Sequence, residues 1–151
     1  MKMSCLLIST FFIAILAGLS ACKKTAQPVD STVAAIWEAS SYHQTFMMPG
    51  MPDATWDTSY EHGKSSVWIL KTNNTFKFID PKLFAGDTIS GTYYIIQGAS
   101  PKIVSNYDDG SFIDTFGYNV SGNLMTLTKT KDFSEGGTSF SLKTETKYTK
   151  Q

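Results

Sequence analysis

Hydrophobic and polar residues follow two different patterns along this chain. Residues 6–19 form a nearly unbroken apolar run. From about Ala34 onwards, short segments alternate between apolar and polar residues and are separated by turn-forming pairs such as Asn73-Asn74 and Asp109-Gly110. Alternation with a period of two is typical of β-strands that bury one face. The pattern therefore predicts an apolar leader followed by an all-β domain.

The alternating part predicts eight strands joined mostly by short turns. The last one alternates best, with Phe140, Leu142 and Tyr148 on one face and Lys143 and Lys147 on the other. Consecutive strands joined by short turns favour an antiparallel up-and-down meander, and about eight such strands can close into a β-barrel. A two-sheet β-sandwich is the alternative, and periodicity does not separate the two. The predicted strands cover residues 34–46, 64–71, 75–80, 88–97, 102–108, 111–120, 124–131 and 139–149.

The leader has the layout of a signal peptide. Lys2 is its one charged residue, and the apolar run is shorter than the ~20 residues that span a bilayer as a helix. It ends in Leu19-Ser20-Ala21-Cys22, which resembles the bacterial lipobox, where the cysteine thiol is acylated and the chain is cut just before it. The resemblance implies a lipoprotein signal peptide over residues 1–21, lipidation of Cys22, a flexible tether over residues 22–32 and a domain over residues 33–151.

The residues after the lipobox indicate which membrane would hold the lipid anchor. In lipoproteins of this kind, an aspartate directly after the lipidated cysteine commonly retains the protein in the inner membrane. Lys23 stands there instead, so the resemblance implies a lipid anchor in the outer membrane. Surface-export signals of some related lipoproteins are acidic, whereas Lys23-Lys24 is basic, which favours the periplasmic face. Two or three acyl chains would hold the chain durably on the membrane.

Composition narrows the possible partners. Basic and acidic residues balance at 13 each, and the sequence has no arginine. A nearly neutral domain without arginine is a poor candidate for nucleic-acid binding. Cys5 would leave with the signal peptide and Cys22 would be acylated, so no disulfide is expected.

Several stretches of the domain resemble the small bacterial lipocalin-like lipoproteins. They are Ile36-Trp37-Glu38, Trp68-Ile69-Leu70, Thr75-Phe76-Lys77-Phe78, Gly91-Thr92-Tyr93-Tyr94 and residues 118–128. The glycine of the lipocalin Gly-x-Trp motif is replaced by Ala35. The resemblance covers nearly the whole domain and implies a lipocalin-like barrel.

A barrel of this size holds either packed side chains or one small ligand. The long segment over residues 47–63 is expected to cap the mouth of the barrel, with its methionines and tryptophan as adaptable apolar contacts. Large aromatic side chains of the late strands are expected to point inwards. The predicted ligand-binding residues are Met47, Met48, Met51, Trp56, Phe112, Phe116, Tyr118, Phe140 and Tyr148.

Metal binding and catalysis find less support in the sequence. The three methionines of the lid lie between His43 and His62 and could hold Cu(I), but the spacing fits no established metal pattern. Neither Gly-x-Ser-x-Gly nor His-Glu-x-x-His occurs. We therefore predict no metal, no cofactor and no enzymatic activity. Two functions remain open: binding of a small apolar or amphipathic ligand, or docking of an envelope protein by a barrel with a filled interior.

Overall fold

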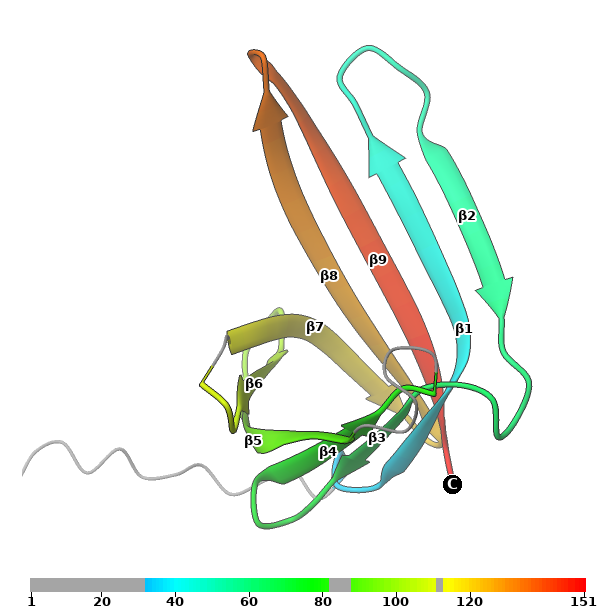
Figure 1. Cartoon of the computed structure of the whole chain (residues 1–151), viewed down its shortest axis with the longest axis vertical. Coiled ribbons are helices and arrows are strands. Elements are labelled where there is room, and N and C mark those ends of the chain that lie inside the picture. The colour runs from blue at the N-terminus through cyan, green and yellow to red at the C-terminus, as the bar shows by residue number, and fades with distance from the viewer. Residues whose placement is uncertain (1–31, 82–87, 111–112) are drawn as a thin grey trace, which may run out of the picture.

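The computed structural model describes residues 32–81, 88–110 and 113–151, and these residues form an all-β structure (Figure 1). Within them, no helix is long and apolar enough to span a bilayer. The nine strands are β1 (Ile36–Met47), β2 (Ala54–Ser59), β3 (Val67–Leu70), β4 (Thr75–Ile79), β5 (Thr88–Ile96), β6 (Lys102–Tyr107), β7 (Ile113–Ser121), β8 (Leu124–Glu135) and β9 (Thr138–Lys150). The predicted signal peptide, Cys22, almost all of the tether, and Phe112 lie outside the described residues.

Eight of the strands close into an antiparallel barrel. From β3 to β9 each strand pairs with the next, and β1 closes the ring by pairing with β9 on one side and with β3 on the other. This confirms the predicted up-and-down barrel over the alternative sandwich. The eight predicted strands are all present, and β2 is an additional ninth strand that pairs with β1.

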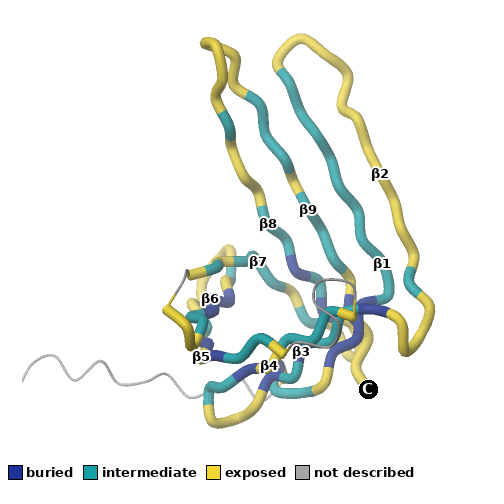
Figure 2. Tube along the Cα trace, in the orientation of Figure 1, coloured by how far each residue is buried: buried dark blue, intermediate teal, exposed yellow. Residues whose placement is uncertain are grey.

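Side chains pack the inside of the barrel. The Trp68 ring lies 5.1 Å from the Phe76 ring and 5.0 Å from the Phe78 ring, centroid to centroid. Trp37 is fully buried, and its Nε1–H donates a hydrogen bond to the Val33 carbonyl at 2.8 Å. Buried residues are confined to the barrel end of the molecule (Figure 2). The buried core consists of Val33, Trp37, Ala39, Trp68, Leu70, Phe76, Tyr93, Ile103, Met125, Leu127 and Tyr148.

A glycine allows two strands and a core ring to approach closely. A Cβ atom built on Gly91 of β5 would overlap the Asn106 carbonyl oxygen of β6 and lie 2.8 Å from Cε1 of Phe76. Only a residue without a side chain fits this position of the barrel wall.

Four strands continue beyond the barrel as a sheet, which we call the projecting sheet (Figure 1). It comprises residues 41–47 of β1, all of β2, residues 129–135 of β8 and residues 138–147 of β9. β7 pairs with β8 only as far as Thr128, and beyond this residue no other described strand pairs with β8 on that side. Gly136 and Gly137, both with positive φ, form the two-residue turn between β8 and β9.

The predicted lid over residues 47–63 is therefore wrong. Its central part is β2, which pairs with β1 in the register Ser41↔Ser59 to Phe46↔Ala54 and extends away from the barrel (Figure 1). All six residues of β2 are exposed, so the strand lacks the apolar alternation that identifies a half-buried strand in a sequence.

Candidate binding surface on the projecting sheet

The projecting sheet has two chemically different faces. Residues directly opposite each other in an antiparallel sheet lie on the same face, so the register assigns each side chain. The aromatic face continues the barrel interior and carries Tyr42, Gln44, Phe46, Trp56, Thr58, Lys129, Lys131, Phe133, Phe140, Leu142 and Thr144. The polar face carries Ser41, His43, Thr45, Met47, Thr55, Asp57, Thr130, Asp132, Ser134, Ser139, Ser141, Lys143 and Glu145.

Three phenylalanines form a cluster on the aromatic face. The Phe140 ring stacks on Phe133, with 5.1 Å between centroids and 13° between planes, and lies 5.4 Å from Phe46. Lys131 Nζ lies 5.1 Å from the centre of the Phe133 ring. The cluster joins β1, β8 and β9 outside the barrel core, where its rings remain partly accessible.

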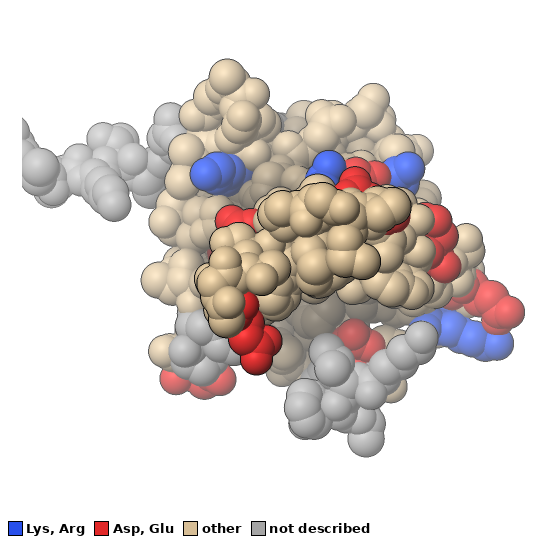
Figure 3. Space-filling view, turned by 90° about the horizontal axis from the view of Figure 1, so that it is seen from above, with Lys and Arg blue, Asp and Glu red and all other residues tan. Residues whose placement is uncertain are grey.

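A groove lies at the free end of the projecting sheet, where the β1 and β8–β9 hairpin ends meet. Its volume is about 660 Å³, within the range of small-molecule sites. Viewed onto this end, the surface is uncharged at its centre, and charged side chains lie around its margin (Figure 3). The groove can therefore receive an apolar group while its rim offers a carboxylate and hydroxyls. Its lining residues are Met47, Met48, Pro49, Asp132, Phe133, Ser134, Ser139, Phe140 and Ser141.

Three of the predicted ligand-binding residues meet in this groove. Met47, Met48 and Phe140 line it. Trp56 lies on the aromatic face and is 54 % exposed, but it does not line the groove. Met51 is exposed in the β1–β2 turn.

The other predicted ligand-binding residues lie in the barrel. Tyr148 is 5 % exposed and belongs to the core, where burial raises its pKa to about 12. Phe116 and Tyr118 are partly buried and pack against that core. The structure therefore separates the predicted set into groove residues and barrel residues.

An ion pair lies between the barrel and the projecting sheet. Lys129 of β8 pairs with Asp114 of β7, just beyond the last backbone pair of these strands, and lies 5.3 Å from the Phe116 ring. The Tyr107 hydroxyl also donates to Asp114, at 3.3 Å. Burial, followed by the charge of Asp114, raises the pKa of Tyr107 to about 12. These contacts link side chains of β6, β7 and β8 to one another beside the core.

His43 lies on the polar face, opposite to the aromatic cluster. Its Nδ1 is 2.7 Å from Asp57 Oδ1, and its Nε2 is 3.1 Å from Thr45 Oγ1. A hydroxyl, an imidazole and a carboxylate in this order resemble a nucleophile, a base and an orienting group. The sheet register alone accounts for the contacts, because Asp57 is the cross-strand partner of His43 and Thr45 is two residues along the same strand. The adjoining hollow measures only about 170 Å³.

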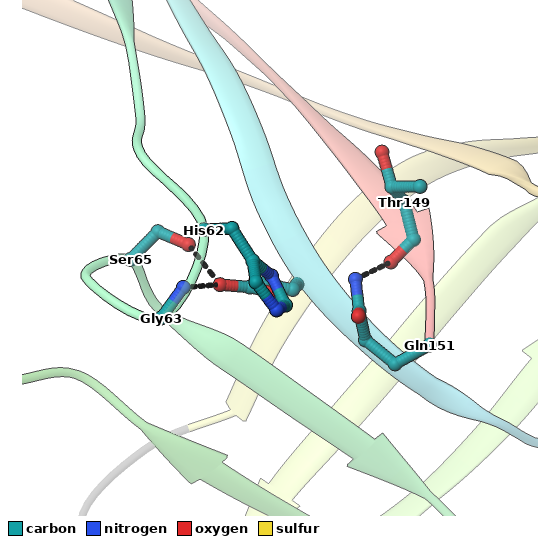
Figure 4. A network of polar contacts seen from close by, with 6 residues as sticks. His62, Gly63, Ser65, Thr149 and Gln151 are labelled. Carbon is teal, nitrogen blue, oxygen red and sulfur yellow. Dashed lines mark hydrogen bonds and ion pairs between the residues drawn. The ribbon is translucent and has the colours of Figure 1, made fainter.

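A buried carboxylate holds the connection between β2 and β3. Glu38 of β1 is 5 % exposed, and it accepts hydrogen bonds from the backbone N–H of Gly63, from His62 Nδ1 and from Ser65 Oγ, the last at 3.4 Å. Figure 4 shows the contacts of Gly63 and Ser65. The Gly63 N–H is the main cause of the lowered pKa of Glu38; burial opposes this effect and His62 adds to it.

Both candidate copper-binding histidines are thus engaged with carboxylates. His43 contacts Asp57 and His62 contacts Glu38. In the part of the chain that the structure describes, no three His, Cys, Asp or Glu side chains gather in a way that could hold a metal ion. The two histidines hold β2 and the connection after it against β1.

Sequence reasoning missed Phe133, which lines the groove, and Phe46, which packs against the groove residue Phe140. Phe133 lies directly opposite Phe140, but the predicted strand ends at residue 131, before this pair. Phe133 and Phe140 are equally far in sequence from the turn-forming pair Gly136-Gly137. This symmetric spacing is the signal that could have revealed the longer hairpin.

No protein-family model matches this sequence, and neither a curated protein nor a solved structure matches it. The choice of function therefore depends on the geometry of the molecule itself.

Proposed function

We propose that this protein is a lipid-anchored, lipocalin-like envelope protein that binds an apolar or amphipathic molecule in the groove of the projecting sheet. The observation that supports this function best is the meeting of Met47, Met48 and Phe140 in one groove of about 660 Å³. The barrel itself serves as the packed support for this site.

The chemistry of the groove suits a ligand with an apolar part. The stacked rings of Phe133 and Phe140 form a rigid apolar wall, and the thioethers of Met47 and Met48 adapt to different shapes. Asp132 adds an acceptor at the rim, so a ligand with a hydroxyl or amine head group would be favoured. A few polar groups beside an apolar wall are typical of sites that orient a small molecule.

The proposed activity is binding without catalysis. The Glu38 carboxylate is occupied by its three donors, and His43 with Asp57 lies on the face opposite to the aromatic cluster. Neither group lines the groove.

The proposed anchor places the protein on the periplasmic face of the outer membrane through an acylated Cys22. Replacing Cys22 by Ser in the full chain should move the protein from the membrane fraction to the soluble fraction after cell lysis. Cys5→Ser is the matched control and should leave the protein in the membrane fraction. A Cys22→Ser chain that stays membrane-bound would contradict the lipid anchor.

Ligand binding in the groove is tested on the unlipidated chain from Lys23 onwards. An anilinonaphthalene dye serves as the fluorescent probe, and a fatty acid competes with it. Phe140→Ala and Phe133→Ala should each weaken binding roughly tenfold, because each removes a large apolar contact worth about 1.4 kcal/mol. Ile113→Ala is the matched control, since Ile113 is 66 % exposed on β7 and remote from the groove residues in the register. Unsaturable dye binding, or equal loss in the control, would refute the ligand site.

Docking of an envelope protein is the second candidate function. It is favoured by the packed barrel interior and by the exposure of Trp56 on the aromatic face. In that case the chain would bind no probe, and Trp56→Ala would abolish a discrete cross-link to an envelope protein while leaving the barrel folded.

A further inference from the structure

The projecting sheet has two outer edges, one along β2 and one along β8 beyond Thr128. Among the described residues, no further strand pairs with either edge. The unpaired backbone N–H and C=O groups of such an edge can accept another strand, and proteins usually protect them with charged residues, proline or a bulge.

The two edges differ in their protection. The free part of β8 carries Lys129, Lys131, Asp132 and Glu135 among seven residues. β2 carries one charged residue, Asp57, which is held by His43. Its pairing with β1 is regular from Ala54 to Ser59, without a bulge. β2 is therefore the edge that is open to another strand.

The backbone contacts show which groups of β2 point outward. The Tyr60 N–H donates to the Ser40 carbonyl at 3.0 Å, so Tyr60 directs its backbone groups towards β1. Backbone direction alternates along a strand, so Thr58 and Trp56 also face β1. The N–H and C=O groups of Thr55, Asp57 and Ser59 face outward and are available to a partner.

We propose that a second copy of this chain pairs with β2, antiparallel, about a two-fold axis that passes between the two Trp56 residues. In this register Thr55 of one copy exchanges backbone hydrogen bonds with Asp57 of the other copy. The two Trp56 side chains then form a non-hydrogen-bonded cross-strand pair, the type in which side chains approach most closely. The axis is perpendicular to the sheet, so the aromatic faces of both copies lie on the same side.

Charge selects this register over its nearest competitor. An axis at Asp57 would place two carboxylates directly opposite each other, which is unfavourable across a strand pair. The axis at Trp56 places each Asp57 opposite a Thr55 hydroxyl instead. The edge is self-complementary in this register. A second copy of the chain therefore fits it in a symmetric, isologous interface, in which both copies use the same strand. The inference goes beyond the proposed function and depends neither on the lipid anchor nor on a ligand.

The mass of the full chain, solubilised in mild detergent, tests the inference by light scattering with the detergent mass subtracted. The expected mass is that of two chains. Thr55→Pro removes an outward-facing N–H that pairs with no other described strand, and it should reduce the mass to one chain. Thr55→Val keeps the N–H and should remain at two chains. A parent chain at single mass, or an unchanged mass in Thr55→Pro, overturns the inference.

Single cysteines test the register under mild oxidation. Trp56→Cys should give a disulfide-linked species of twice the chain mass, because position 56 meets itself across the axis. Thr58→Cys lies on the same face but meets Ala54 of the other copy, so it should give no more than the background of the parent chain. Equal cross-linking at both positions overturns the register. A cross-link of Trp56→Cys to a protein of another mass overturns the second copy in favour of a different partner strand. Failure of the dye titration with the double mass intact would refute the ligand site alone.

Discussion

Replacing Glu38 by Gln tests whether the buried carboxylate stabilises the fold by holding the β2–β3 connection. The side chain is 5 % exposed and accepts from Gly63, His62 and Ser65. A hydrogen bond to a charged group contributes roughly 1.5–3 kcal/mol, and a neutral one about 1 kcal/mol. The oxygen of Gln can still accept from the Gly63 N–H and from Ser65 Oγ, which share one Glu38 oxygen, but the NH₂ group that replaces the other oxygen cannot accept from His62. We expect a loss of about 2 kcal/mol in the free energy of unfolding, or about 8 °C in Tm for a domain of this size.

The pH dependence of the free energy of unfolding separates the contribution of the Glu38 charge from the contribution of its packing. The pKa of Glu38 is lowered in the folded state, mainly by the Gly63 N–H. Its charge therefore stabilises the fold fully above the unfolded-state pKa of about 4.3, and this stabilisation is lost as the pH falls through the folded-state value. Urea denaturation at pH 7 should show the full difference between the parent and Glu38→Gln, and the difference should shrink below about pH 4.

Glu61→Gln is the matched control for this experiment. Glu61 lies in the same connection and pairs with Lys64 at 2.6 Å, but both side chains are exposed. Such a pair contributes less than about 0.5 kcal/mol. Equal losses in Glu38→Gln and Glu61→Gln, or a Glu38→Gln loss that stays constant down to pH 3, would refute the reasoning.

Two further substitutions test the packing of the barrel wall by urea denaturation. Gly91→Ala should cost about 3 kcal/mol, because its Cβ overlaps the Asn106 carbonyl oxygen and the strands must move apart; stability equal to the parent would contradict this close approach. Ser105→Ala should raise stability by about 1 kcal/mol, because the fully buried Ser105 hydroxyl finds no hydrogen-bond partner among the described residues. A loss above about 1 kcal/mol in Ser105→Ala would contradict this and show that the Ser105 hydroxyl is hydrogen-bonded in the folded protein.

The barrel could be predicted because patterns in short stretches of the sequence identify its strands. Alternation such as Phe76-Lys77-Phe78 and turns such as Asn73-Asn74 identify half-buried strands and their ends from neighbouring residues alone. Asn74 indeed adopts a positive φ of 65° in the β3–β4 turn. Up-and-down connectivity then follows from the short links between successive strands.

The projecting sheet could not be predicted in the same way. β2 buries no face, so its sequence does not alternate between apolar and polar residues. Its assignment as a strand depends on pairing with β1, which is a tertiary contact. The predicted lid failed for this reason, although Met47 and Met48 from the same segment do line the groove.

A β-bulge explains why Phe46 was missed. Trp37 and Ala39 are buried in the barrel, so strict alternation would keep odd-numbered residues of β1 on the inner face. The pairing of β1 with β9 shifts between Ala39 and Ser41, and beyond it the even-numbered residues lie on that face. Phe46 thereby meets Phe140, whose strand β9 runs without a shift against β8. The sequence contains no local mark of this shift.

The bulge also divides β1 into two parts with different tasks. The part before it carries Trp37 and Glu38, which hold the barrel and the β2–β3 connection. The part after it carries Met47 to the groove and places Phe46 against Phe140, which lines the groove; each residue of strand adds about 3.3 Å of distance from the barrel core. Phe46→Ala should therefore weaken probe binding with a small loss of stability, whereas Trp37→Ala should unfold the domain and remove binding with it. Comparable losses of stability in both variants would show that the projecting sheet belongs to the cooperative core.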